Sequence, residues 1–134
     1  MKTTASIFFL AAALALAGCK TEPPPTVAAK YTGIPSKNLT VVVTCSDPTT
    51  RFMGCITTDG GADHLIGMSS GTYQTSGHEI TIEFKKTDKP GILKLAVSSE
   101  GKSLGTCTTA ENLGGVRAEL LFAPPQEHAL FTTF

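Results

Sequence analysis

The stretch HEITIEFKK, residues 78–86, decides the fold class of this chain. Within it, Ile80, Ile82 and Phe84 alternate with polar or charged residues, which are Glu79, Thr81, Glu83 and Lys85. An apolar residue at every second position predicts a strand with one buried and one wet face, as in an antiparallel sheet.

Short runs of similar character lie on both sides of this stretch. We expect strands over residues 39–44, 51–58, 64–69, 93–97, 103–108, 116–122 and 129–134. Turn-forming residues separate these runs, and the turn at residues 46–49 is expected to join the first two strands into a hairpin. The pattern predicts an all-β fold, a small antiparallel barrel or sandwich of about seven to eight short strands.

The first residues of the chain have a different character. Met1-Lys2 is followed by the uncharged run SIFFLAAALALA, residues 6–17. As a helix this run would rise about 18 Å, which is too short for the roughly 30 Å of a bilayer's hydrocarbon core. A short positive start followed by such a run is typical of a secretory signal peptide.

The signal ends in Leu16-Ala17-Gly18-Cys19, which resembles the lipobox of bacterial lipoproteins at all four positions. The resemblance implies cleavage before Cys19, a diacylglyceryl thioether on its sulfur and acylation of its new amino group. Several acyl chains would hold the protein on a membrane. By resemblance to the lipoprotein sorting pattern, Lys20 in place of an Asp favours the outer over the inner membrane in a cell that has both. We therefore expect a lipid-anchored protein of the outer membrane in the bacterial cell envelope.

These features predict three segments. Residues 1–18 are the lipoprotein signal peptide, and residues 19–36 are the lipidated N-terminus with a proline-rich spacer that contains Pro23-Pro24-Pro25 and Pro35. Residues 37–134 form a single β domain.

Composition and cysteine spacing restrict the chemistry. The formal net charge is zero and no basic stripe is present, which argues against nucleic acid as a partner. An oxidising compartment permits one disulfide among Cys45, Cys55 and Cys107, either Cys45–Cys55 or Cys45–Cys107. The spacings lack CxxC and the histidines are scattered, so we expect no metal site and no cofactor.

No arrangement typical of an enzyme is present. A catalytic site needs a nucleophile beside a base, or paired carboxylates, and we assign no catalytic residue and expect no enzyme activity. His64 and His78 are interpreted as solvated loop residues. Four aspartates are interpreted as caps of local turn backbone, namely Asp47, Asp59, Asp63 and Asp88.

One longer stretch is similar to a known family. Ser70-Gly71-Thr72-Tyr73 is followed by Phe84-Lys85-Lys86, and Val43-Thr44-Cys45-Ser46-Asp47 precedes both. Across residues 40–107 this pattern resembles the membrane-bound and periplasmic inhibitors of c-type lysozyme, which are small eight-stranded barrels. The resemblance implies that Ser70 enters the lysozyme cleft, with Tyr73 in the same motif, and that Lys85 or Lys86 contacts an acidic group.

The same resemblance implies a Cys45–Cys107 disulfide with Cys55 unpaired. The expected role is therefore that of an envelope lipoprotein that acts by binding a protein, with occlusion of c-type lysozyme as its most specific form. Two alternatives stay open. One is a lipoprotein that binds another envelope protein, as an immunity, exclusion or assembly factor does, and the other is a small-ligand carrier.

Overall fold

The structure is a computed structural model that describes residues 31–87, 91–124 and 127–134. The expected signal peptide, the lipidation site Cys19 and residues 20–30 of the expected spacer lie outside these residues. The chain divides into the units Met1–Gly33 and Ile34–Phe134, and of the first unit residues 31–33 are described, as a turn. Across the described ranges, no helix has the length and hydropathy needed to cross a bilayer.

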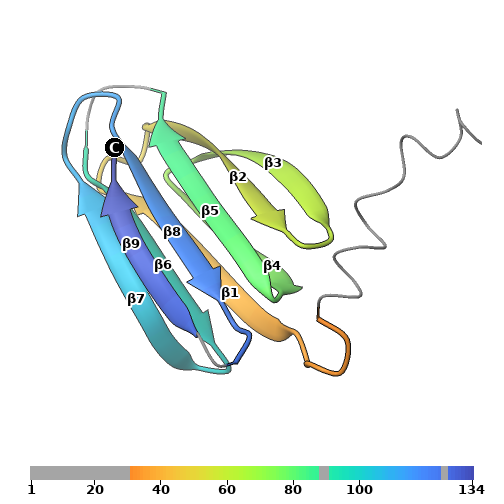
Figure 1. Cartoon of the computed structure of the whole chain (residues 1–134). Helices are drawn as coiled ribbons and strands as arrows, with labels where there is room; N and C mark the ends of the chain where they lie inside the picture. Colours follow the sequence, from red (N-terminus) through yellow and green to blue (C-terminus); the bar gives the residue numbers. More distant parts are fainter. Residues whose placement is uncertain (1–30, 88–90, 125–126) are drawn as a thin grey trace, which may run out of the picture. The chain divides into compact units, whose positions relative to one another are not determined.

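The second unit contains nine strands, and no helix occurs among the described residues (Figure 1). The strands are β1 Lys37–Cys45, β2 Arg51–Thr58, β3 Gly61–Met68, β4 Ser70–Gly77, β5 Glu79–Lys86, β6 Leu93–Ser99, β7 Lys102–Thr109, β8 Gly115–Leu121 and β9 His128–Thr133. The predicted all-β fold is confirmed, with one strand more than the sequence pattern indicated.

All strand pairs are antiparallel, and the strand order is β7-β6-β1-β4-β3-β2-β5-β8-β9. Between β3 and β4, however, the ladder consists of the single pair Met68↔Ser70. The sheet therefore has two halves that meet at this point. We call them the β1 half, which is β7-β6-β1-β4, and the β2 half, which is β3-β2-β5-β8-β9.

At the opposite seam the two halves adjoin through β7 and β9. The Phe131 ring of β9 lies against Gly105 of β7, and the Cys107 Sγ lies 3.5 Å from the carbonyl oxygen of Thr132. The two halves thus enclose one core between their inner faces.

Two expectations about the strands are wrong. The segments at residues 39–44 and 51–58 do not form a hairpin, because β1 pairs with β4 and β6 while β2 pairs with β3 and β5. Residues 46–50 instead carry the chain from one half to the other. The strand β4 was not expected, because the inward positions of SGTYQTSG hold only one large apolar residue, Tyr73.

The core is made by alternate residues of the strands, as the pattern in residues 78–86 predicts. Its buried members are Leu39, Val41, Val43, Cys45, Phe52, Ile56, Ile80, Ile82, Phe84, Leu93, Leu95, Val97, Val116, Ala118 and Leu120. Complete burial of one large aliphatic or aromatic side chain stabilises the fold by about 1.5–3 kcal/mol.

Three aromatic rings link the two halves at the centre of this core. The ring of Phe84 meets that of Phe52 edge-on, with centroids 5.7 Å apart, and stacks on Tyr73 of β4 at the same separation. Gly54 lies directly opposite Phe84 in the ladder, and a Cβ at this position would clash with the Phe84 ring and with the carbonyl oxygen of Glu83. The missing side chain therefore provides the space that the Phe84 ring occupies.

We expect Gly54→Ala to lower the free energy of unfolding by about 1–3 kcal/mol, because the ring of Phe84 and the β5 backbone would have to move. Gly60→Ala is the matched control, since the nearest atom to its Cβ would be Thr58 Oγ1 at 3.6 Å. The control should change the free energy by no more than about 0.5 kcal/mol. Urea unfolding measures both, and equal effects of the two substitutions would contradict the proposed packing.

Candidate functional site

Two of the residues predicted to bind a partner, Ser70 and Lys85, lie exposed on the outer face of the sheet. Ser70 begins β4 and pairs with Met68 of β3, whereas Lys85 lies near the end of β5 and pairs with Met53 of β2. Side chains on neighbouring paired residues point to the same face of a sheet. The structure therefore places both residues on one continuous surface, although their strands are not neighbours.

The other two predicted residues, Tyr73 and Lys86, point inward. Tyr73 packs against the core, and burial raises the pKa of its hydroxyl. Lys86 is only 1% exposed, and its Nζ donates a hydrogen bond to the carbonyl oxygen of Gly91 at 2.8 Å. The expectation that Lys86 contacts a partner is wrong, because position 86 continues the inward series of Ile80 and Phe84 and covers the end of the core.

Three exposed apolar side chains lie between Ser70 and Lys85. Met53 is 50% exposed, Ile66 80% and Met68 56%. Met53 and Ile66 are direct cross-strand partners on the outer face of β2 and β3, and Met68 follows Ile66 on the same face. The sequence pattern did not reveal this cluster, because the outward direction of Ile66 depends on the pairing of β3 and not on its composition.

Phe134 adds a fourth apolar side chain at the far side of Lys85. Its backbone pairs with Gly115, its ring covers Gly115, and Gly115 is the ladder partner of Lys85. We call Met53, Ile66, Met68 and Phe134 the apolar patch. It borders a hollow of about 240 Å³ that is lined by Met53, Gly54, Cys55, His64, Glu83, Phe84, Lys85 and Phe134.

The charges beside the patch are partly neutralised by one another. Arg117 of β8 donates hydrogen bonds from Nη1 to Glu83 and from Nε to Glu119 Oε2, the latter at 2.7 Å. Among the described residues Lys85 forms no ion pair, so its ammonium group is available to a partner at the border of the patch.

The predicted Cys45–Cys107 disulfide is not formed in the structure, where Cys45, Cys55 and Cys107 are all free thiols. Strand β6 lies between β1 and β7, with Leu93 opposite Cys45 and Leu95 opposite Cys107. Two strand spacings separate the cysteines by roughly 10 Å, whereas the Cα atoms of a disulfide lie within about 7 Å. Burial raises the pKa of the Cys45 and Cys107 thiols, which favours their unreactive protonated form.

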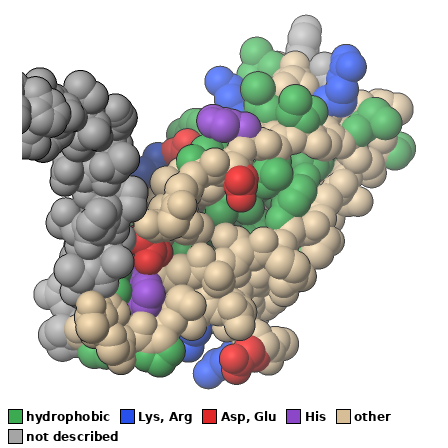
Figure 2. All heavy atoms as spheres, turned by 90° about the vertical axis from the view of Figure 1, so that its right-hand side faces the viewer, with side chains coloured by type: hydrophobic (Ala, Val, Ile, Leu, Met, Phe, Trp, Pro, Cys, Tyr) green, Lys and Arg blue, Asp and Glu red, His purple; other side chains and the backbone are tan. Residues whose placement is uncertain are grey.

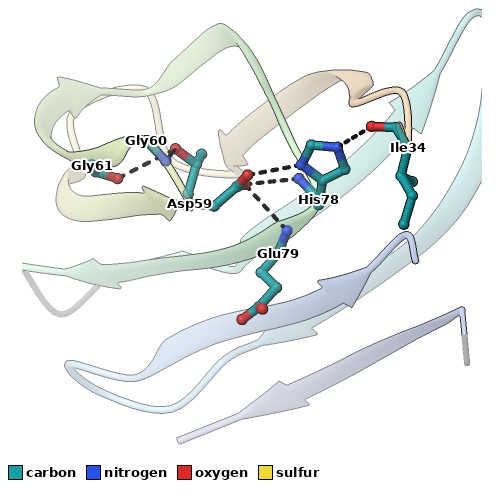
Figure 3. A network of polar contacts seen from close by, with 7 residues as sticks. Ile34, Asp59, Gly60, Gly61, His78 and Glu79 are labelled. Atoms are coloured by element: carbon teal, nitrogen blue, oxygen red, sulfur yellow. Dashed lines mark hydrogen bonds and ion pairs between the residues drawn. The ribbon is translucent and has the colours of Figure 1, made fainter. Parts of the chain in front are cut away.

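A second polar cluster holds the connection between β4 and β5 (Figure 3). His78, the single residue between these strands, donates from its backbone N–H to Asp59 Oδ1 at 2.8 Å. Its Nδ1 donates to Asp59 Oδ2 at 2.8 Å, and its Nε2 donates to the carbonyl oxygen of Ile34 at 2.6 Å. Because a carbonyl and a carboxylate only accept, both ring nitrogens carry protons and His78 is an imidazolium cation.

The geometry corrects the sequence-based interpretation of His78 as a solvated loop residue and of Asp59 as a cap of local turn backbone. The His78 side chain is only 13% exposed, so it is not a solvated loop histidine. Asp59 reaches across 19 positions and also accepts from the Glu79 N–H at 3.3 Å, so it caps the start of β5. In its own turn the Gly60 N–H donates instead to Thr58 Oγ1 at 3.0 Å. Asp47 does cap its local turn, accepting from the Thr49 N–H at 2.8 Å, whereas Asp63 lies within β3 and Asp88 lies outside the described residues.

The same contacts shift the pKa of both groups. Burial acts to raise the pKa of Asp59, but hydrogen bonds from the His78 side chain and from the backbone outweigh it and lower the pKa to about 2. The hydrogen bond to Asp59 raises the pKa of His78, and the Ile34 carbonyl adds to that effect. The pair thus keeps its opposite charges over a wider pH range than either group would alone.

Comparisons with known proteins add no family or relative. No protein-family model, no curated protein and no solved structure matches this chain. In the described ranges of the chain, no group of three or more His, Cys, Asp or Glu side chains could hold a metal ion. The exposed side chains of the apolar patch, with Ser70 and Lys85 at its border, make this outer surface the candidate site, and it offers contacts suited to binding.

We expect the Asp59–His78 pair to stabilise the folded chain most between about pH 4 and pH 6.5. Asp59 has a folded pKa of about 2 against 3.8 in the unfolded chain, so its contribution is complete above pH 3.8 and is lost as the pH falls through 2. The folded pKa of His78 lies above 6.5, so its contribution is complete below pH 6.5 and is lost as the pH rises through the folded pKa.

Asp59→Asn should flatten both limbs of this profile and, at pH 5.5, lower the free energy of unfolding by about 1–3 kcal/mol, because a buried ion pair loses one partner. Asp63→Asn, at an exposed position of β3, is the control and should keep the profile of the parent chain. Urea unfolding at pH 3, 5.5 and 8 makes the measurement. A parent profile without a fall from pH 5.5 to pH 8 would count against the imidazolium assignment.

Proposed function

We propose that this chain is a lipid-anchored protein of the bacterial cell envelope that acts by binding another protein. The lipobox resemblance at Cys19 supports the anchor and the compartment. The observation that carries the binding role is the apolar patch, in which Ile66 is 80% exposed beside Met53 and Met68. Contiguous exposed apolar side chains with a polar border are typical of protein interaction sites.

The two alternatives differ in how well they fit this geometry. A small-ligand carrier needs an open interior, whereas the inner faces here are filled by the core side chains of both halves. Binding to another envelope protein needs only an exposed surface of suitable chemistry, which the patch provides. The patch is accordingly the surface on which we place the partner.

We expect a photoreactive amino acid at position 66 to form a covalent adduct with a partner in cells. A partner that covers the patch lies against this side chain and excludes the water that would otherwise react with it. The same amino acid at position 94 is the control, since Lys94 is exposed on β6 of the other half. Ile66→Ser should weaken complex formation about tenfold or more, and Leu130→Ser, at a position that is 52% exposed on β9, should leave it unchanged. Adducts at neither position, or equally at both, would count against the proposal.

Inhibition of c-type lysozyme is the second candidate. The observation that favours it is the position of Ser70 and Lys85, which border the apolar patch on one face. In this proposal Ser70 donates a hydrogen bond to a carboxylate in the lysozyme cleft, Lys85 contacts a second acidic group, and the patch covers the rim. Lys86 and Tyr73 act within the fold by supporting β5 and β4.

We expect the protein at equimolar ratio to impede lysis of cell walls by c-type lysozyme. Ser70→Ala and Lys85→Ala should each weaken inhibition by about tenfold, since each removes one charge-assisted contact. Lys94→Ala serves as the matched control for a lost surface lysine. Unimpaired lysis in the presence of the parent chain would remove lysozyme as the partner and leave the general binding role to the adduct experiment.

A further inference from the structure

We propose that the opening between β3 and β4 receives an extended segment of a partner protein, which adds to the sheet as a strand. The inference rests on the proposed role in protein binding and deepens it by defining the form of the bound segment. We call the facing edges of residues 61–67 and 71–77 the β3–β4 opening.

The ladder shows that both edges of the opening have unused hydrogen-bonding groups. β3 pairs with β2 along its whole length, and β4 pairs with β1 along its whole length. Toward each other they share only Met68↔Ser70, and no other described strand pairs with either edge. In an antiparallel strand every second residue points its N–H and C=O away from a given neighbour, so each edge presents a row of donors and acceptors.

Ser69, at the closed end of the opening, fixes the point from which β3 and β4 diverge. Ser69, the single residue between β3 and β4, has a φ of 69° and is held by both halves. Its N–H donates to the Thr50 carbonyl at 2.9 Å, and its carbonyl accepts from the Cys45 N–H at 2.7 Å. The two strands thus leave a fixed junction and enter different halves, where each is held by its other neighbour.

The composition of the two strands leaves these edges unprotected. Exposed edges are usually guarded by lysine, proline or a bulge, which prevents pairing with other chains. GADHLIGM and SGTYQTSG contain no Lys, Arg or Pro, and their one formally charged residue is Asp63. Their ladders with β2 and β1 also run without a register shift. Such edges favour pairing with a further strand.

Side chains on both faces suit the same occupant. Leu65 and Tyr73 are partly buried on the inner face beside the opening, and Ile66 is exposed on the outer face. Viewed from the side of β3 and β4, hydrophobic side chains lie at the base of a hollow with an acidic side chain over it (Figure 2). An added strand would place apolar residues beside Leu65 and Ile66 and a basic residue near Asp63.

A free segment fits the opening better than a second copy of this chain. A strand that already belongs to a sheet has one edge occupied, so it can pair with β3 or with β4 but not with both. An isolated extended segment has two free edges and can use the donors and acceptors of both strands.

The test pans a phage-displayed library of random peptides, each about twelve residues long, against the full chain. We expect enriched peptides to slow amide hydrogen exchange about tenfold or more in residues 61–67 and 71–77. A synthetic version with N-methyl groups on alternate residues keeps its side chains but loses the donors of one edge, and it should bind about tenfold more weakly. Ile66→Lys should reduce binding, with Leu130→Lys as the control.

Several results would overturn the inference. These are a library without enriched peptides, protection outside the two strands, and unchanged affinity after N-methylation. A full chain whose β3 amides are protected before any peptide is added would show that a second copy or the chain itself fills the opening, and the sedimentation behaviour of the chain separates these two cases. Adducts at position 66 together with any of these results would leave the binding role intact and remove strand addition alone.

Discussion

The contact of the Phe84 ring with Phe52, Tyr73 and the bare backbone of Gly54 is the interaction on which the two halves of the sheet depend. Tyr73 belongs to the β1 half, whereas the other three residues belong to the β2 half. The halves share only one ladder pair at this side, so side-chain packing joins them there beyond that pair and the backbone bonds of Ser69. The outer surface can therefore be continuous across Met68 and Ser70 while the edges beside them stay unpaired.

Two single residues carry the chain between the halves on either side of β4. Ser69 is held by backbone hydrogen bonds, and His78 by an ion pair with Asp59 and by the carbonyl of Ile34. Ser69 adopts a left-handed backbone conformation that is unfavourable for a residue other than glycine, and His78 carries a charge. In both cases the hydrogen bonds offset the cost. The buried Lys86 has a similar role at the end of β5, where it satisfies the carbonyl of Gly91.

The sequence predicted the fold class because alternation is a local property. The bounds of β2 agree with the expected strand at residues 51–58, and residues 80, 82 and 84 are buried as expected. Pairing is not local, so the expected hairpin between the first two strands was wrong. The candidate site was only partly predictable for the same reason. Ser70 and Lys85 could be named from a motif, but Met53 and Ile66 form a surface only through the ladder of β2 with β3.

The seam between β7 and β9 has a consequence for how the protein matures. The ring of Phe131 reaches Gly105, and β1 already depends on residues as distant as Ser98. Such long-range contacts form slowly, because long loops must be ordered before any contact offsets their entropy. A polypeptide with this route cannot close its sheet until β9, the ninth strand along the chain, is available to pair. Maturation must therefore wait until the last strand has emerged, and until then the nascent chain exposes adhesive apolar segments that need shielding from aggregation.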